Sequence, residues 1–149
     1  MSKGTISSTT TPSVAKLQLP DIQEHLEKEY STLSIRDLVN TCHLLAVANH
    51  WWHEEDGTPK ELNFGERIAL MHSELSEGLE GFRKNLPSDH IPGFSMVEEE
   101  FADTMIRIAD TAQAMKMDLN AAIKAKLLYN LTRPDHKIEN RNAEGGKKF

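Results

Sequence analysis

The amino-acid sequence predicts an all-α protein built as a bundle of four to five helices. Apolar residues recur at spacings of three and four along most of the 149 residues, as they do in helices that bury one side. No segment alternates apolar and polar residues in the manner of a half-buried strand. Helix-capping residues and Gly- or Pro-containing breaks separate the periodic segments. The length suits one domain with a hydrophobic core.

Composition divides the chain into three parts. Residues 1–20 begin as a Ser/Thr-rich stretch without an apolar run, which predicts a disordered arm rather than a signal peptide. Residues 21–134 carry the helical periodicity and form the predicted domain. Residues 135–149 are polar and basic without periodicity, so we expect them to form a tail.

The first two helices are expected to begin at capping residues. Asp21 can cap a short amphipathic helix through Tyr30, and Ser34 can cap a second helix that runs to about His53. Residues 54–60 contain Asp-Gly-Thr-Pro, a combination that breaks helices and predicts a loop.

A long third helix is expected from about Asn63 to Asn85. Its core-facing stripe is predicted to consist of Phe64, Ile68, Met71, Leu75, Leu79 and Phe82. Gly78 and Gly81 lie inside it, each at a cost of about 1 kcal/mol relative to alanine in a helix interior. Two interpretations of these glycines stay open: close packing between helices, or room for a ligand beside Glu77.

Two further helices follow a loop rich in Pro and Gly. Ser95 and Glu98 have the spacing of a capping box, which opens a helix through about Lys116. Asp118 is expected to cap the last helix, which stops before Pro134. The inward-facing residues are predicted to be Val97, Phe101, Met105, Ile108 and Ala112 in the first of these helices and Ala122, Ala125, Leu128 and Leu131 in the second.

Two pairs of acidic residues carry most of the functional information. Glu74 and Glu77 lie three residues apart, as do Glu100 and Asp103, so each pair occupies one side of a helix. Each pair borders an apolar stripe, and the short loop between the two helices allows antiparallel packing. Four converging carboxylates would have to share protons or cations, and such oxygen ligands suit Mg²⁺ or, alternatively, Mn²⁺. One pair alone is common on solvated helices, so the prediction rests on both pairs.

Composition excludes several other classes. None of the seven histidines has an acidic residue three positions before it, which argues against a di-iron carboxylate bundle. The single cysteine, Cys42, excludes an internal disulfide and a cysteine zinc cluster. The net charge of −6 argues against a surface for nucleic acid polymers. No stretch is long and apolar enough to span a membrane, so we expect a cytoplasmic protein without membrane contact.

The acidic pairs and one downstream segment resemble a known family. Residues 74–77 read Glu-Leu-Ser-Glu and residues 100–103 read Glu-Phe-Ala-Asp, which is similar to the paired acidic motif of MazG-like all-α NTP pyrophosphohydrolases. Residues 126–134 resemble the Lys-x-x-Tyr-Asn-x-x-Arg-Pro segment that ends the last helix of that family. The Gly-Gly-Lys-Lys-Phe ending at 145–149 also resembles family tails. The resemblance covers roughly residues 43–149.

This resemblance implies Mg²⁺-dependent hydrolysis of a nucleoside triphosphate, often a deoxynucleotide, to the monophosphate and pyrophosphate, as in nucleotide-pool house-cleaning. It also implies a homodimer or homotetramer. The metal ligands would be Glu74, Glu77, Glu100 and Asp103. Lys126 and Asn130 would contact the phosphates or the sugar, and Tyr129 would line the pocket. Arg133 could add a bidentate phosphate contact.

The general base stays open at this point. Many relatives have a glutamate just before the first ligand, where this chain has Ser73. The base could be one of the four carboxylates, His72, or water activated by the metal alone. Base and sugar preference do not follow from the motifs.

An aromatic cluster at residues 50–53 is the best candidate for a nucleobase pocket, with His50, Trp51 and Trp52 as its predicted lining. Stacking of a base on an aromatic ring is worth roughly 1–3 kcal/mol. Adjacent residues lie about 100° apart around a helix, so at most one tryptophan should face the pocket. In the alternative, one tryptophan belongs to the core and the other to a subunit interface.

Two further charged residues receive structural interpretations. Arg107, four residues after Asp103, is expected to form a salt bridge along its own helix rather than to clamp a phosphate. Asp110 continues the side of Asp103 and is a candidate for orienting a neighbouring group. Two alternatives to NTP hydrolysis remain: a non-catalytic helical interaction module with solvated acidic edges, and a metal-dependent hydrolase of another phosphorylated small molecule.

Overall fold

The computed structural model describes residues 34–146, and over this range the protein is all-α, as predicted. The arm predicted at 1–20 and the helix predicted at 21–30 lie outside the described residues. Between residues 34 and 146 no strand forms, and the only β-pairing consists of isolated bridges. In chain order the elements are α2 (Ile35–Ala48), α3 (Phe64–Lys84), α4 (Met96–Ala114), α5 (Leu119–Thr132), the 3-10 turn η2 (Pro134–His136) and α6 (Ile138–Asn142).

The predicted capping residues begin the helices. The side chain of Ser34 accepts a hydrogen bond from the third residue of α2. Ser95 and Glu98 form the complete capping box at the start of α4. Asp118 accepts from the backbone N–H of Ala121 at the start of α5. These caps confirm the predicted helix starts, because each satisfies a backbone donor that has no partner within the helix.

Two boundaries differ from the predictions. α2 ends at Ala48 rather than near His53, because the chain turns at His50, whose φ is 60°. The segment after Pro134, predicted to lack regular structure, contains η2 and the short helix α6. Among the described residues, none of the helices combines the length and apolarity that crossing a bilayer requires.

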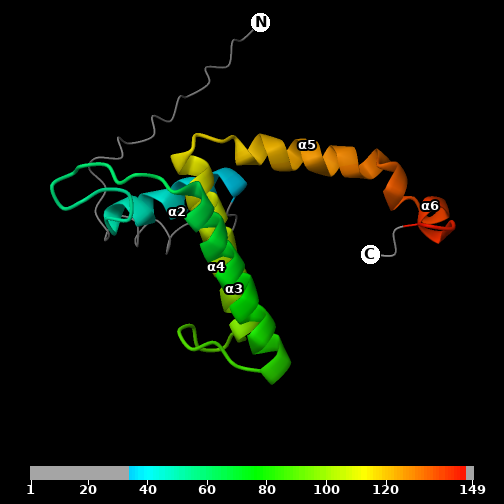
Figure 1. The fold of residues 1–149 in the computed structure, drawn as a ribbon, viewed down its shortest axis with the longest axis horizontal. Helices are drawn as coiled ribbons and strands as arrows, with labels where there is room; N and C mark the ends of the chain where they lie inside the picture. The colour runs from blue at the N-terminus through cyan, green and yellow to red at the C-terminus, as the bar shows by residue number, and fades with distance from the viewer. Residues whose placement is uncertain (1–33, 147–149) are drawn as a thin grey trace, which may run out of the picture.

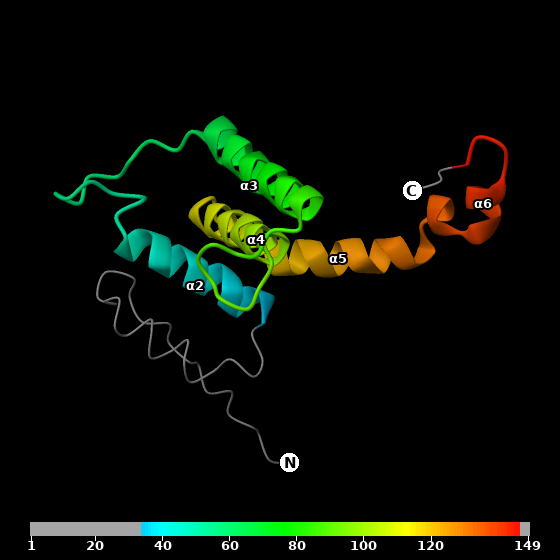
Figure 2. The same ribbon diagram turned by 90° about the horizontal axis from the view of Figure 1, so that it is seen from below.

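The helices α3 and α4 pack along each other as an antiparallel pair, and α2 packs against α4 (Figures 1 and 2). The small apolar core lies between α2 and α4. Its buried members are Val39, Cys42 and Ala109, with Ile35, Leu38 and Leu119 packed around them. From the end of α4, α5 extends away from this group, and its start packs against α2 and the small core (Figures 1 and 2).

The predicted inward orientation of the apolar stripes is wrong for most of their residues in the chain taken alone, although Ala112 is buried and Ile68, Met71 and Val97 are half-buried. Leu79 of α3 is 59% exposed and Phe101 of α4 is 56% exposed. The stripe residues that share this exposed class are Phe64, Leu75, Phe82, Met105, Ile108, Leu128 and Leu131. The reason is that α3 and α4 meet through another side of each helix, and no other described element covers the stripes.

The two glycines of α3 lie in the α3–α4 contact. A Cβ built on Gly78 would lie 3.3 Å from Cβ of Glu100, and one built on Gly81 would lie 2.7 Å from Cγ of Met96. Both glycines are buried. Their absence of a side chain therefore serves close packing of the two helices, which decides between the two interpretations left open by the sequence.

This contact predicts that Gly81→Ala destabilises the protein by about 1–3 kcal/mol, because the added methyl would lie 2.8 Å from Cβ of Met96, which cannot move without the backbone of α4. Chemical denaturation of the two proteins measures the difference. Gly65→Ala is the matched control. Its Cβ meets only Asn63 Oδ1 at 3.5 Å, so its stability should stay equal or rise by up to about 1 kcal/mol. Equal stabilities for Gly81→Ala and Gly65→Ala would contradict the packing described here.

Candidate metal centre

The contact between α3 and α4 brings three predicted carboxylates together. Glu74 and Glu77 come from α3 and Glu100 comes from α4, and each offers a ligand oxygen within 4.8 Å of the other two. Glu74 and Glu100 are 7% and 6% exposed, whereas Glu77 is exposed. Two buried carboxylates beside a third are costly to keep ionised without a cation or a proton between them.

Asp103, the fourth predicted ligand, lies at the edge of this cluster. It follows Glu100 by three residues on α4, but it is exposed and does not join the group whose oxygens all lie within 4.8 Å. Partial burial and the negative charge of Glu74 raise the pKa of its carboxyl. Asp103 is therefore close enough to the cluster for the charge of Glu74 to act on it.

The electrostatics of the cluster favour positive charge. Burial raises the pKa of Glu100 to about 7, with further contributions from a hydrogen bond to Glu74 and from the charges of Glu77, Glu74 and Asp103. The donor atoms are all carboxylate oxygens, which fit hard divalent cations such as Mg²⁺ and Mn²⁺. Mg²⁺ commonly keeps several waters among its ligands, and the exposed side at Glu77 gives solvent access to the cluster.

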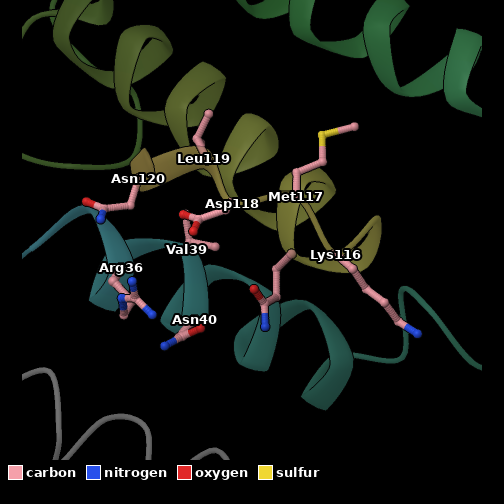
Figure 3. A pocket seen from close by; sticks show the side chains of 9 residues that line it. Arg36, Val39, Asn40, Lys116, Met117, Asp118, Leu119 and Asn120 are labelled. Atoms are coloured by element: carbon pink, nitrogen blue, oxygen red, sulfur yellow. The ribbon is translucent and has the colours of Figure 1, made fainter. Parts of the chain in front are cut away.

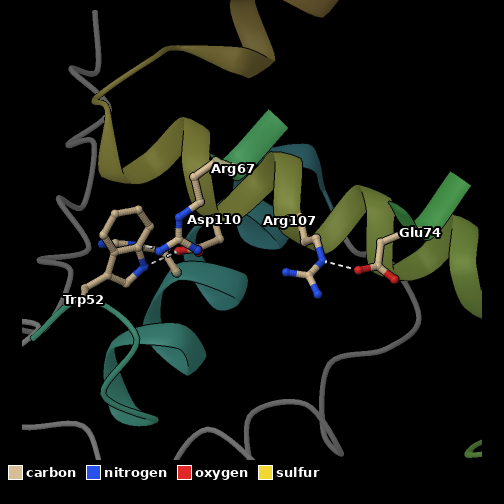
Figure 4. A network of polar contacts seen from close by, with 6 residues as sticks. Trp52, Arg67, Glu74, Arg107 and Asp110 are labelled. Carbon is tan, nitrogen blue, oxygen red and sulfur yellow. Dashed lines mark hydrogen bonds and ion pairs between the residues drawn. The ribbon is translucent and has the colours of Figure 1, made fainter. Parts of the chain in front are cut away.

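Arg107 supplies the nearest positive charge. Its Nε lies 2.7 Å from Oε1 of Glu74, so it bridges α4 to α3 (Figure 4). The sequence predicted a salt bridge along α4 itself, and the prediction is wrong in its partner. The Nε–H does not point at the carboxylate, because the buried Nε has no hydrogen bond of acceptable geometry despite the short distance. The contact is therefore an ion pair by proximity.

A cavity of about 210 Å³ lies beside the cluster. Asp103 and Arg107 form one part of its wall, and Trp51, Arg67 and Asp110 form another. The remaining lining residues are Cys42, Leu45, Ala46, Asn49 and Ile106. The cavity is therefore lined by both charged and apolar side chains, and Arg107, which pairs with Glu74, links it to the carboxylate cluster.

Asp110 lines this cavity and contacts three further side chains, those of His43, Trp52 and Arg67. Its Oδ1 accepts a hydrogen bond of 2.8 Å from Trp52 Nε1. The same oxygen lies 2.8 Å from His43 Nδ1. The guanidinium of Arg67 lies 4.2 Å from the Trp52 ring centre, with Nη1 3.9 Å from Asp110 Oδ2 (Figure 4). The predicted orienting role of Asp110 therefore has specific partners. It holds the buried ring of Trp52 behind the cavity and lies beside the guanidinium of Arg67, which lines the cavity.

His43 and Arg67 were not among the predicted site residues. Arg67 lies seven residues before Glu74, and Asp110 lies seven residues after Asp103, so each continues a functional side of its helix by two turns. That spacing could have indicated Arg67. Nothing in the sequence places His43 of α2 beside α4.

The aromatic cluster separates as expected for neighbouring residues. Trp51 lines the cavity and is 60% exposed, whereas Trp52 is buried and donates to Asp110. His50 does not line the cavity. It is exposed in the turn after α2, where its carbonyl oxygen accepts from Lys60 Nζ.

The residues predicted on the last helix are not brought to the cluster. Lys126 and Tyr129 pair with each other on α5, where the ammonium lies 4.7 Å from the ring centre. Arg133 pairs with Asp135 just after α5. Asn130 has a buried Oδ1 without a hydrogen-bond partner. All four lie on or just beyond the helix that extends away from α3 and α4 (Figures 1 and 2).

A larger cavity of about 450 Å³ lies elsewhere, between the start of α2 and the turn from α4 to α5 (Figure 3). None of the predicted site residues lines it. Its single carboxylate, Asp118, is engaged in capping α5. Of these two cavities the smaller is therefore the better candidate for a functional site, because Asp103 and Arg107, the neighbours of the carboxylate cluster, line it.

No protein-family model, curated protein or solved structure matches this chain. The fold and the site by themselves define a class: an all-α protein with a three-carboxylate cluster between two antiparallel helices and a charged cavity at its side.

The raised pKa of Glu100 gives a pH dependence to the metal-free protein. The carboxyl titrates near 4.5 in the unfolded chain and near 7 in the folded protein, so its protonation favours folding. This stabilisation is complete below pH 4.5 and is lost as the pH rises through 7. In EDTA, the melting temperature of the wild type should therefore fall between pH 5 and 8 by more than that of Glu100→Gln. Glu61→Gln, at an exposed position, is the control and should follow the wild type.

Proposed function

We propose that this protein hydrolyses (deoxy)nucleoside triphosphates to the nucleoside monophosphate and pyrophosphate with Mg²⁺ as cofactor. The observation that carries the proposal is the convergence of Glu74, Glu77 and Glu100 between α3 and α4, at the positions of the paired acidic motif. The resemblance of residues 74–103 and 126–134 to MazG-like pyrophosphohydrolases supports the same activity. A role in clearing unwanted nucleotides in the cytoplasm is part of this proposal.

The carboxylate cluster and the residues that line the cavity have separate functions in this proposal. The carboxylates hold the cation, and Mg²⁺ bound there would neutralise phosphate charge and lower the pKa of a water molecule. Arg67 contributes a fixed positive charge for the phosphates, since the Trp52 ring and Asp110 hold its guanidinium at the cavity. Trp51 offers an exposed ring on which a base can stack.

The hydroxyl of Ser73 has no part in the chemistry proposed. It donates a hydrogen bond of 2.7 Å to the carbonyl oxygen of Leu70, within α3. The replacement of a motif glutamate by Ser73 therefore leaves water activation to one of the carboxylates, to His72 or to the metal alone.

A homo-oligomer, a dimer or a tetramer, is the second part of the proposal. The stripes of α3, α4 and α5 leave several large apolar side chains exposed among the described residues, and contiguous exposed apolar surface is typical of protein–protein interfaces. α5 carries Lys126 and Asn130 away from the carboxylates of its own chain (Figure 2). Packing of two copies through these stripes would cover apolar surface and allow α5 of one copy to approach the cluster of the other.

The activity is tested by pyrophosphate release from a panel of canonical and damaged NTPs and dNTPs, with Mg²⁺ and with EDTA. Release should require the metal, and Glu77→Gln should lower it by more than about 100-fold, because the variant removes a ligand oxygen charge. Glu80→Gln is the matched control. It lies three residues further along α3 and pairs with Arg83 and Lys84, so its activity should equal that of the wild type.

Absence of release from every nucleotide would overturn the enzymatic proposal and favour an interaction module built on the apolar stripes. Release that EDTA or Glu77→Gln leaves unchanged would place the activity outside the carboxylate cluster.

The assembly is tested by light scattering of the full chain. The wild type should have the mass of a dimer or tetramer, and Leu79→Glu should shift it toward the monomer, because the charge would be buried in the proposed interface. Thr58→Glu adds the same charge to an exposed loop and should leave the mass unchanged. A wild type with the mass of one chain would contradict the proposed assembly.

A further inference from the structure

Arg107 lies between the two halves of the proposed site. Its Nε is 2.7 Å from Glu74 Oε1, a member of the three-carboxylate cluster. The same side chain lines the cavity of about 210 Å³ together with Arg67 and Asp103. It is 35% exposed, so it has room to move, whereas Glu74 is 9% exposed at its side chain.

The geometry of the Arg107–Glu74 ion pair suits a contact in which another cation can take the place of Arg107 beside Glu74. The Nε–H is not aimed at the carboxylate, and Nε has no hydrogen bond of acceptable geometry. A guanidinium that served only to hold α3 and α4 together would be expected to form a bidentate pair with good geometry. Here the positive charge sits beside a ligand oxygen without the directional bonds that would keep it there.

Competition with a metal ion follows from this position. A cation bound by Glu74, Glu77 and Glu100 would repel the guanidinium and take over its carboxylate oxygen. Arg107 cannot respond by losing its proton, because a guanidinium stays charged in proteins. It must therefore find another anion or solvent, and the cavity that it already lines lies next to it.

We propose that Arg107 is a positioning residue that exchanges partners: it neutralises Glu74 in the metal-free protein, and metal binding releases it into the cavity to bind the phosphate chain of the substrate. This inference rests on the proposed function, since it takes the carboxylate cluster as the metal site. It adds an order of events, in which the metal both binds phosphate and frees a bidentate phosphate ligand.

The proposed exchange and a merely supporting role of Arg107 predict opposite changes in metal affinity when Arg107 is removed. If Arg107 only oriented Glu74 for the metal, its removal would weaken metal binding by about 10–100-fold, as loss of such partners does. If Arg107 competes with the metal, its removal must strengthen the binding of the metal alone. Removal must also weaken the binding of a polyphosphate to the metal-loaded protein.

The experiment measures Mn²⁺ binding to the full chain by electron paramagnetic resonance, first alone and then with inorganic tripolyphosphate, which tests phosphate recognition without a base. Compared with the wild type, Arg107→Gln should bind Mn²⁺ alone several-fold more tightly and bind tripolyphosphate at least about tenfold more weakly. Arg83→Gln is the matched control. Arg83 pairs with Glu80 at an exposed position of α3, so neither affinity should change.

A second measurement keeps the positive charge at residue 107, so it also applies if Arg107→Gln fails to fold. The Nε–Hε resonance of Arg107, assigned by its disappearance in Arg107→Lys, should shift when Mg²⁺ is added to the wild type. It should shift again when tripolyphosphate follows. The corresponding resonance of Arg83 should stay in place throughout.

The outcomes separate this inference from the proposed function. A wild type that binds no Mn²⁺, or that loses none of its binding in Glu77→Gln, overturns the metal centre itself. A wild type that binds Mn²⁺ at the cluster, with equal or weaker binding in Arg107→Gln or an unshifted Arg107 resonance, overturns the exchange and leaves the metal centre intact.

Discussion

The close contact of α3 with α4 is the constraint on which the rest of this structure depends. Gly78 and Gly81 let the helices approach until Glu74 and Glu100 are buried against each other. Burial of two like charges opposes folding, and this cost raises the pKa of Glu100 to about 7, whereas the positive charge of Arg107 beside Glu74 offsets part of it. A cluster that needs positive charge in its resting state is also one that can take up a metal ion.

The same contact explains why the polar and apolar sides of the helices are arranged as they are. The polar residues Glu74, Glu100 and Asp110 are buried in the α3–α4 pair, whereas most residues of the apolar stripes are exposed. In an ordinary single-chain bundle these positions would be reversed. The arrangement is reasonable where the helix pair provides the site and its outer sides pack against further copies of the chain.

The predictions that depend on interactions between residues close together in the sequence agree with the structure. The starts of α2, α4 and α5 depend on a side chain and a backbone N–H within three residues of each other, so Ser34, Ser95 and Asp118 could be assigned directly. The pairing of Glu74 with Glu77 depended only on helical spacing. Their approach to Glu100 required one further assumption, antiparallel packing across a short loop, which the structure bears out.

The amino-acid sequence by itself determined the helices, their caps and the carboxylates that share a helix side, because these follow from interactions within one or two helical turns. Only the tertiary structure decided what depends on distant residues. It separated Trp51 at the cavity from Trp52 at Asp110, paired Arg107 with Glu74 rather than within α4, and carried Lys126 and Asn130 away from the cluster. Helical periodicity says which residues share a side, but the partner of that side is set by how the helices pack.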